Sequence, residues 1–340
     1  MTSSADARTA VDIAIPLEAI RDARQRLKPY LIETPLLPWY GTTLGGAFDG
    51  GTRVSVKLEL TQRTGSFKPR GALNVMQHLS PDERTRGVTA VSAGNHAMAV
   101  AFAAAELGVS AKVVMPRRAS PFRVAQCRRY GAEVVLADDI AAAFAEGTRL
   151  RDEEGRVLVH PFEGPHTIAG TGTLGMEIVE QAPDADAIIV PVGGGGLIAG
   201  IANAVKQLKP TMQVFGVEPE GAQGMSQSLA AGAPVQRVHV DTIADSLGAP
   251  LHTPGTFGLI RRYVDDIVLV DDQAMIDAMD LTFRDLKLAV EPAGACALAG
   301  LLGPLRNRLR GRSVVLVVCG SNIDPRSYAA LLARATSHER

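Results

Sequence analysis

Short runs of apolar, often β-branched residues alternate along the chain with longer segments in which apolar residues recur at helical spacing. Most of the short runs are continuously apolar, which is typical of parallel strands covered by helices on both faces. The predicted strands are Val54–Leu60, Val88–Ser92, Ala111–Met115, Ala132–Leu136, Ile188–Val192, Val214–Val217, Ile267–Val270 and Ser313–Val318. The predicted helices are Gly71–Leu79, His96–Leu107, Phe122–Tyr130, Gly172–Gln181, Leu197–Lys206, Asp272–Leu286 and Pro292–Arg306. This alternation predicts an α/β fold with an open parallel sheet, which binds ligands at the carboxyl ends of its strands.

The length of 340 residues is enough for about two domains of ~150 residues each. Two polar stretches, Ser80–Gly87 and Arg149–Arg156, interrupt the apolar pattern. We interpret them as the edges of a small α/β domain formed by residues 86–156. The remaining residues, 1–85 and 157–340, are then expected to form one larger α/β domain.

The composition narrows the classes of function. Apolar residues make up 46% of the chain and charged residues 21%, as in an ordinary globular protein. The 35 basic and 36 acidic side chains give a net charge of -1, which argues against a nucleic-acid partner. The three cysteines, Cys127, Cys296 and Cys319, form no C-x-x-C pair, so neither a disulfide framework nor a cysteine-zinc site is expected. A reducing, cytoplasmic compartment fits this cysteine content.

One uncharged stretch, Ala187–Val205, approaches the ~20 residues of a membrane-spanning helix. Pro191 and the consecutive glycines Gly193–Gly196 divide it, which favours a strand, a loop and a helix. The first residues, Met1–Arg21, carry charges where a signal peptide needs an apolar core. We therefore expect no membrane partner.

Candidate chemistry lies in the loops between predicted strands and helices. The loop Thr64–Gly71 places Lys68 next to Phe67 at the start of a helix, where the helix dipole disfavours a cation. A lysine exposed to solvent is the simpler interpretation. The functional alternative is a desolvated amine that acts as a nucleophile or forms a Schiff base. Phe67 is by default a core residue, and its alternative role is to pack against a cofactor.

The loop Ser92–His96 follows a predicted strand and opens the next helix. Backbone N–H groups at a helix start bind anions such as a carboxylate. Ser and Asn are also the ordinary capping residues of helices, so both interpretations stay open for this loop. His96 is favoured as a structural residue.

The glycines Gly193–Gly196 join a buried strand to an apolar helix and expose several backbone N–H donors, which favours a phosphate site. The spacing Gly194-x-Gly196-x-x-Ala199 also fits a dinucleotide fingerprint, with Glu218 as a ribose partner. The absence of a following Gly-Lys-Ser/Thr argues against a P-loop. A fourth loop, Cys319–Asn322, ends the last predicted strand.

Taken together and in this order, these loops resemble the fold-type II pyridoxal-phosphate enzymes, above all the threonine/serine dehydratase (ammonia-lyase) family, with serine racemase as near kin. The similarity extends from about Thr34 to Asp324, nearly the whole chain. It is carried by seven motifs: Thr64–Leu73, Ser92–His96, Pro161–Glu163, Gly193–Leu197, Thr242–Asp245, Glu291–Ala295 and Cys319–Asn322. The resemblance implies a two-lobed fold like that of the tryptophan synthase β chain, and a homodimer or homotetramer.

The resemblance also implies roles for individual residues. Lys68 would carry pyridoxal 5'-phosphate through an imine, with Phe67 against the ring, Asn95 at the ring hydroxyl and Cys319 at the ring nitrogen. The phosphate would be held by the backbone of Gly193, Gly194, Gly195 and Gly196, and Leu197, Ser246 and Glu291 would complete the cofactor site. The substrate carboxylate would be received by Ser92, Ala93, Gly94, Asn95 and His96, in the small domain.

A cysteine at the ring nitrogen has a chemical consequence. A thiol does not hold that nitrogen protonated as an aspartate would, so loss of a β-leaving group competes better with transamination. Lys68 would remove the Cα proton as general base. The implied reaction is the dehydration and deamination of L-threonine, L-serine or a related 3-hydroxy amino acid to a 2-oxo acid and ammonia.

Departures from the family pattern narrow this expectation. Ala93 stands where serine racemase-like enzymes have a serine that protonates the opposite face of Cα, so dehydration is favoured over racemisation. Gly224 stands where a relative that binds a divalent metal has a carboxylate, so a magnesium site is not expected. A monovalent cation held by Glu218, Ala222 and Leu247 stays an alternative. The sequence ends soon after Asn322, so we expect no regulatory domain of the biosynthetic type.

Several alternatives stay open. A 3-hydroxyaspartate or other bulky 3-hydroxy amino acid is one substrate alternative, and Arg117, Arg118 and Arg123 are candidates to meet a second carboxylate, although a solvated basic face is the favoured interpretation. A serine racemase-like enzyme is another. An NAD-dependent oxidoreductase and a non-catalytic amino-acid sensor are the alternatives from other classes.

Overall fold

Two sheets organise the computed structural model, which describes residues 14–40, 44, 48 and 51–336; the first 13 residues of the charged start lie outside the described part. The larger sheet has the strand order β1-β2-β10-β7-β8-β9, and the smaller has the order β5-β4-β3-β6. The strands are β1 (Leu36–Pro38), β2 (Arg53–Lys57), β3 (Val88–Val91), β4 (Ala111–Pro116), β5 (Glu133–Ala137), β6 (Val157–Leu158), β7 (Ala187–Pro191), β8 (Gln213–Pro219), β9 (Asp266–Val270) and β10 (Ser313–Val317).

Helices fill the connections between these strands. They are α1 (Leu17–Leu27), α3 (Pro69–Gln77), α4 (Pro81–Arg86), α5 (Asn95–Leu107), α6 (Pro121–Arg129), α7 (Ile140–Glu153), α8 (Pro165–Gln181), α9 (Gly196–Leu208), α10 (Gly224–Ala231), α11 (Pro254–Tyr263), α12 (Asp272–Leu286), α13 (Pro292–Leu302) and α14 (Pro325–Leu332). Short 3-10 turns are η1 (Glu59–Thr61), η2 (Arg63–Gly65), η3 (Glu220–Ala222) and η4 (Asp245–Leu247).

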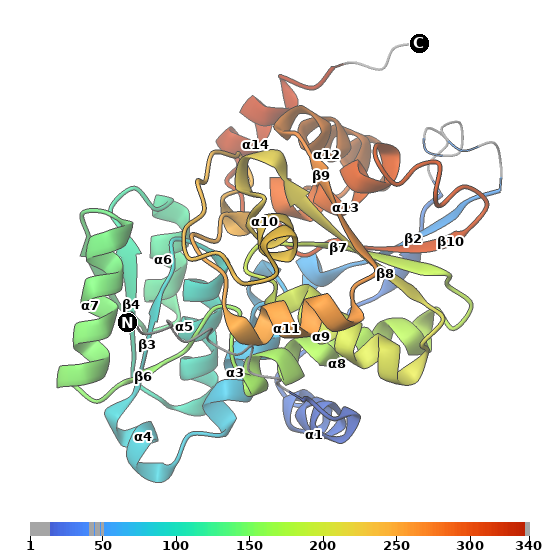
Figure 1. The fold of residues 1–340 in the computed structure, drawn as a ribbon. Helices are drawn as coiled ribbons and strands as arrows, with labels where there is room; N and C mark the ends of the chain where they lie inside the picture. The colour runs from blue at the N-terminus through green and yellow to red at the C-terminus, as the bar shows by residue number, and fades with distance from the viewer. Residues whose placement is uncertain (1–13, 41–43, 45–47, 49–50, 337–340) are drawn as a thin grey trace, which may run out of the picture.

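The described strands pair in parallel except for β1, which pairs antiparallel with β2 at the edge of the larger sheet. This confirms the expected α/β fold with open parallel sheets. Figure 1 shows the smaller sheet and its helices on the left and the larger sheet on the right. The division at residues 86 and 156 stays a prediction; β6, which starts at residue 157, pairs with β3 in the smaller sheet.

The alternating direction of the side chains along the strands of the smaller sheet explains why helices cover both of its faces. Ala90 and Val113 belong to the apolar cluster that contains α5, whereas their neighbours Val91 and Val114 pack with α7. Successive strand residues point to opposite faces, so both faces need an apolar cover. The continuous apolar runs of the sequence arise from this two-sided burial.

The larger sheet is covered in the same way. Helix α13 packs against β7, β8 and β9, and α12 packs on its outer side. Helices α8 and α9 pack against each other, α9 contacts β7, and α1 and α3 contact α8 (Figure 1). Because these strands are parallel, their carboxyl ends lie on one edge of each sheet. The loops and helix starts that follow lie there too, and they carry the candidate residues.

The polar stretches that we interpreted as breaks are largely helical. Helix α4 occupies the first one and begins with a capping box, in which Ser80 and Glu83 satisfy each other's backbone N–H groups. The second contains the last turn of α7. The strand expected to reach Leu60 stops at Lys57, and α13 ends at Leu302, before the expected Arg306.

No helix among the described residues combines the length and the apolar character that crossing a bilayer requires. The apolar run that begins at Ala187 consists instead of β7, the glycine loop and α9, as expected.

Candidate active site

Lys68 is placed by a loop that is folded against the end of the larger sheet. The loop contains two residues in the left-handed region, Thr64 (φ 64°) and Gly65 (φ 72°). Its backbone then follows the segment after β10, where the Phe67 N–H donates to the Cys319 carbonyl at 3.1 Å. Lys68 is the residue that caps the start of α3, and the proline that follows it suits the first turn of a helix. The loop therefore fixes the lysine next to Cys319.

The side chain of Lys68 is half-buried, and a carbonyl holds its amine. Its Nζ donates to the Pro161 carbonyl oxygen at 2.7 Å. Burial lowers the pKa of Lys68 to about 8, because the charged form loses its water, and the nearby Cys319 and Glu291 oppose this shift. Burial also raises the pKa of Cys319 well above its usual value, so its thiol is neutral and its opposition is weak. A substantial fraction of the Lys68 amine is therefore neutral near pH 8, as a nucleophile or base requires.

The glycine loop lies between β7 and α9, with Gly195 at the N-cap of α9 in a backbone conformation (φ 91°) that favours glycine. A Cβ at Gly194 would lie 2.1 Å from the Phe162 ring, and a Cβ at Gly196 would lie 2.6 Å from the Phe162 carbonyl oxygen. The glycines are thus required by the close approach of the Phe162 segment. The loop before α9 therefore carries no side chains, and the free backbone N–H groups of a helix start favour an anion.

These segments enclose one cavity. It contains about 440 Å³ of space between atoms, part of which is open to solvent. All the residues that the resemblance assigned to the cofactor line it: Phe67, Lys68, Asn95, Gly193, Gly194, Gly195, Gly196, Leu197, Ser246, Glu291 and Cys319. Phe162, Pro191, Leu247 and Ala293 line it as well.

Polar side chains join opposite walls of the cavity. The Asn95 amide donates to Glu291 Oε1 at 2.7 Å and accepts from Asn322 Nδ2 at 2.7 Å. The Ser246 hydroxyl also donates to Glu291 Oε1, at 3.2 Å. Burial raises the pKa of Glu291, and the nearby Arg123 opposes the shift. Through these contacts Glu291, the residue before α13, links the loop after β3 to η4.

The loop expected to receive the substrate carboxylate lies beside the cavity. The Gly94 N–H donates to the Ser92 hydroxyl at 3.1 Å, and α5 begins at Asn95. His96 is buried with Nε2 2.8 Å from the Val159 carbonyl oxygen. Burial, aided by the charge of Lys68, lowers the pKa of His96 to about 3, so the imidazole is neutral at ordinary pH. Ser92, Ala93, Gly94 and His96 do not line the cavity, and their contact with substrate stays a prediction.

Arg123 was interpreted as part of a solvated face, and the structure buries it. Its guanidinium pairs with Asp245 of η4 and donates to the Asn322 carbonyl at 3.0 Å. A Cβ at Gly94 would lie 3.1 Å from its Nη1 atom. Arg117 instead pairs with the exposed Asp138. Asp245 and Asn322 lie far from Arg123 in the sequence, so no local pattern predicts these contacts.

Glu218 serves a helix start. Its carboxylate is buried and accepts from the N–H groups of Met225 and Ser226, each at 2.8 Å, and from the Ser226 hydroxyl. A carboxylate engaged in this way suits the N-terminus of α10 and not the ribose of a dinucleotide. Within the described residues, no three His, Cys, Asp or Glu side chains form a metal-binding group. The monovalent cation at Glu218, Ala222 and Leu247 stays a prediction.

Some residues of the site were missed by sequence reasoning. Pro161 and Phe162 belong to a motif that we quoted for the resemblance without giving it a role, and they contact the Lys68 amine and the glycine loop. The signal in the sequence is the glycines at 194 and 196, which indicate that another segment approaches closely. The sequence does not show which segment this is. Ala293 and Pro191 carry no chemical signal.

Comparisons with known proteins agree with this geometry. A family model described as "Pyridoxal-phosphate dependent enzyme" matches residues 27–320. The chain is 49% identical over 320 residues to a phenylserine dehydratase of Ralstonia pickettii, covering 92% of this chain and 95% of that protein. It is 41% identical over 313 residues to an L-threonine ammonia-lyase of Thermotoga maritima, covering 91% and 76%. The structure of maize serine racemase superposes with a TM-score of 0.88 at 36% identity, covering 95% and 98%. With its half-buried lysine, its glycine loop and this match over most of its length, the chain belongs to the family of pyridoxal-phosphate dependent enzymes.

Proposed function

We propose that this protein eliminates water from a 3-hydroxy-L-amino acid, L-threonine or L-serine first of all, and that water then hydrolyses the dehydrated product to a 2-oxo acid and ammonia. One observation carries the proposal. The desolvated amine of Lys68 shares a cavity with a glycine-rich helix start and adjoins a second helix start that is suited to a carboxylate. A base and an anion site are thus near each other. The names of the relatives, a phenylserine dehydratase and an L-threonine ammonia-lyase, support the same reaction.

The residues present fit the family's cofactor, pyridoxal 5'-phosphate. The site offers one cavity-lining amine for the aldehyde, N–H groups at the start of α9 for the phosphate, and a neutral thiol at Cys319. When bound, the cofactor supplies an electron sink for the negative charge that forms at the substrate Cα. Lys68, Gly193–Gly196 and Cys319 are the residues that would hold it.

The remaining steps are assigned to this chain's own residues. The neutral Lys68 amine takes the Cα proton, and burial favours its neutral form. The Pro161 carbonyl holds the amine through a 2.7 Å hydrogen bond. The start of α5 binds and orients the substrate carboxylate through backbone N–H groups. The substrate β-hydroxyl then leaves with the help of a proton.

Dehydration is proposed over racemisation because of Ala93. Racemisation needs a second acid or base on the opposite face of Cα, and Ala93, in the loop before α5, offers only a methyl group. The likeness to maize serine racemase is therefore taken as a likeness of fold and cofactor.

The substrate is tested by a panel of amino acids. Purified holoenzyme is assayed for ammonia with L-threonine, L-serine, L-threo-3-phenylserine and 3-hydroxyaspartate, and the ratios kcat/KM are compared. We expect turnover of L-threonine or L-serine, with the bulkier substrates as the alternatives. Ammonia release from none of the four would contradict the proposal, and turnover of 3-hydroxyaspartate alone would move it to the dicarboxylic substrate. Lys68→Ala is the inactive control.

We also propose a cytoplasmic homo-oligomer. Support for a reducing compartment comes from the three cysteines, all buried free thiols. Self-association is what the resemblance to the family implies. Light scattering of the purified protein measures the oligomeric state, and a monomer at assay concentration would contradict the oligomer.

A further inference from the structure

A cluster of four buried charges lies outside the cavity, beneath the start of α3. It consists of Lys57 at the end of β2, Glu59 in η1, Arg70 in α3 and Glu177 in α8, each at most 4% exposed. Two positive and two negative charges balance within the cluster. We call these four residues the buried charge cluster.

Arg70 uses its complete hydrogen-bonding capacity in this cluster. Its guanidinium donates to both oxygens of Glu59, at 2.7 and 2.8 Å, and to both oxygens of Glu177, at 2.7 and 3.0 Å. A fifth bond goes to the Thr173 hydroxyl at 3.0 Å. A guanidinium has five N–H donors in a rigid planar fork, and all five have a partner here. The fork therefore fixes both the position and the plane of the side chain.

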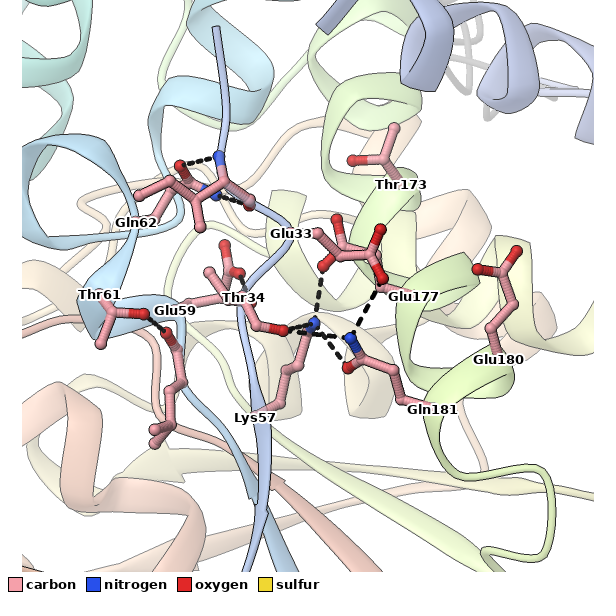
Figure 2. A network of polar contacts seen from close by, with 12 residues as sticks. Glu33, Thr34, Lys57, Glu59, Thr61, Gln62, Thr173, Glu177, Glu180 and Gln181 are labelled. Carbon is pink, nitrogen blue, oxygen red and sulfur yellow. Dashed lines mark hydrogen bonds and ion pairs between the residues drawn. The ribbon is translucent and has the colours of Figure 1, made fainter. Parts of the chain in front are cut away.

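Lys57 closes the other side of the cluster. Its amine donates to Glu177, to the Thr34 carbonyl and to Gln181, at 2.6, 2.6 and 2.9 Å (Figure 2). The Thr34 hydroxyl donates in turn to Glu59 Oε1 at 2.6 Å. Each charged group of the cluster is thus paired and hydrogen-bonded.

The cluster joins the elements that surround Lys68. Arg70 lies two residues after Lys68, in the first turn of the same helix. Glu177 lies on α8, which starts shortly after the Pro161 carbonyl that holds the Lys68 amine. A Cβ at Gly170 of α8 would lie 2.2 Å from the Arg70 carbonyl oxygen, so the two helices are in backbone contact. The guanidinium fork therefore sets the start of α3 relative to the segment that receives the amine.

Stability alone does not account for such a cluster. Desolvation of buried charges largely cancels their attraction, and well-packed apolar residues often serve equally well. Such a cluster can instead serve to position a reactive group, because a displacement of that group by about 1 Å can lower the rate ~100-fold. We propose that the buried charge cluster, through Arg70, is a positioning device that holds the Lys68 amine at its working position. This inference rests on the proposed function only for its kinetic readout.

The test compares holoenzyme variants by spectroscopy and by kinetics. Arg70→Lys keeps the charge but offers three donors in place of five. We expect the pH midpoint of the cofactor's visible absorbance to shift, and kcat to fall about 10- to 100-fold with a smaller change in KM. The double variant Lys57→Met/Glu177→Gln removes one charge of each sign and keeps the Arg70–Glu59 pair, so it is the test if Arg70→Lys does not fold. A smaller shift in the same direction is expected.

The control is Leu150→Ala, which opens a cavity in α7 on the far face of the smaller sheet. It should lower Tm without moving the absorbance midpoint or kcat. The inference would be overturned if the cluster variants kept the absorbance midpoint and the kcat of the parent enzyme. It would also be overturned if Leu150→Ala showed the same changes as the cluster variants. The absorbance titration needs no substrate, so a failure of the proposed substrate class would leave this readout intact.

Discussion

At the scale of the residue, we propose that position 93 decides which faces of the substrate Cα meet a proton donor. Ala93 offers none, and we predict that Ala93→Ser gains interconversion of L- and D-serine over the parent enzyme. A positioned acid or base is worth about 10²–10⁴-fold, which sets the upper range of the gain. Chiral chromatography of the reaction mixture measures it. Ala93→Gly, which adds no hydroxyl, is the matched control, and equal racemisation by both variants would refute the argument.

Single residues differ in how far the sequence predicts them. Lys68, Asn95, Cys319 and the glycines could be located because each lies in a loop with a recognisable residue pattern, and the structure brings them to one cavity. Arg123 could not, because its partners lie more than a hundred residues away. Asn95 was expected at the cofactor's ring hydroxyl, and its observed partners, Glu291 and Asn322, are likewise distant in sequence.

At the scale of the element, the glycine loop and the Phe162 segment form one packed unit. We predict that Gly194→Ala weakens cofactor binding strongly, because the added Cβ would lie 2.1 Å from the Phe162 ring. Spectrophotometric titration of the apoenzyme with pyridoxal 5'-phosphate measures the change in Kd. Gly51→Ala is the control, since a Cβ there meets its nearest atom at 3.4 Å, an ordinary contact.

A second substitution separates packing from a general loss of structure. Phe162→Ala in the Gly194→Ala background removes the ring that the new methyl group strikes, so part of the affinity for the cofactor should return. Coupling between residues in direct contact is about 0.5–3 kcal/mol. Strictly additive losses in Kd would show that the glycine is needed for another reason.

Strands were predicted better than helices, since α1, α7 and α11 were not among the predicted helices. The eight expected strands are all present, because continuous apolar runs mark strands that are buried on both faces. Most of their ends lie within two residues of the expected position. Strands β1 and β6 are too short to leave a pattern. Helix α4 was interpreted as a break because its exposed residues lack an apolar face, and it is specified by its capping box instead.

At the scale of the whole molecule, buried neutral histidines couple stability to pH. Burial is the first cause of a lowered pKa for His96 (about 3), His160 (about 4) and His252 (about 4), against 6.5 when exposed. Below pH 6.5 the unfolded chain therefore binds protons that the folded chain does not. The free energy of unfolding therefore decreases as the pH is lowered from about 6.5 to 4, by up to about 1.4 kcal/mol per pH unit for each histidine.

Urea denaturation at several pH values in this window measures the effect. We expect the midpoint concentration to fall steadily with acidification in the parent protein. His252→Gln removes one of the three groups at a position distant from Lys68 in the sequence, so its stability should depend less steeply on pH. A parent protein whose stability stays constant down to about pH 5 would contradict the coupling.

The strand order belongs to the same scale and was not predictable. Strand β10 lies between β2 and β7, so the last strand along the chain completes the centre of the larger sheet. Apolar runs indicate that a strand is buried but not which strands flank it. This order brings the Cys319 loop beside the Lys68 loop, and only the resemblance to a known family pointed to that meeting.

The central claim is that the amine of residue 68 carries the cofactor, and one measurement tests it directly. The yellow holoenzyme is reduced with borohydride, digested, and analysed by mass spectrometry for the lysine that retains the reduced cofactor. The account predicts a single modified peptide containing Lys68 and none from the Lys68→Ala variant. A modified peptide containing another lysine, or cofactor released unattached from the reduced parent protein, would contradict it.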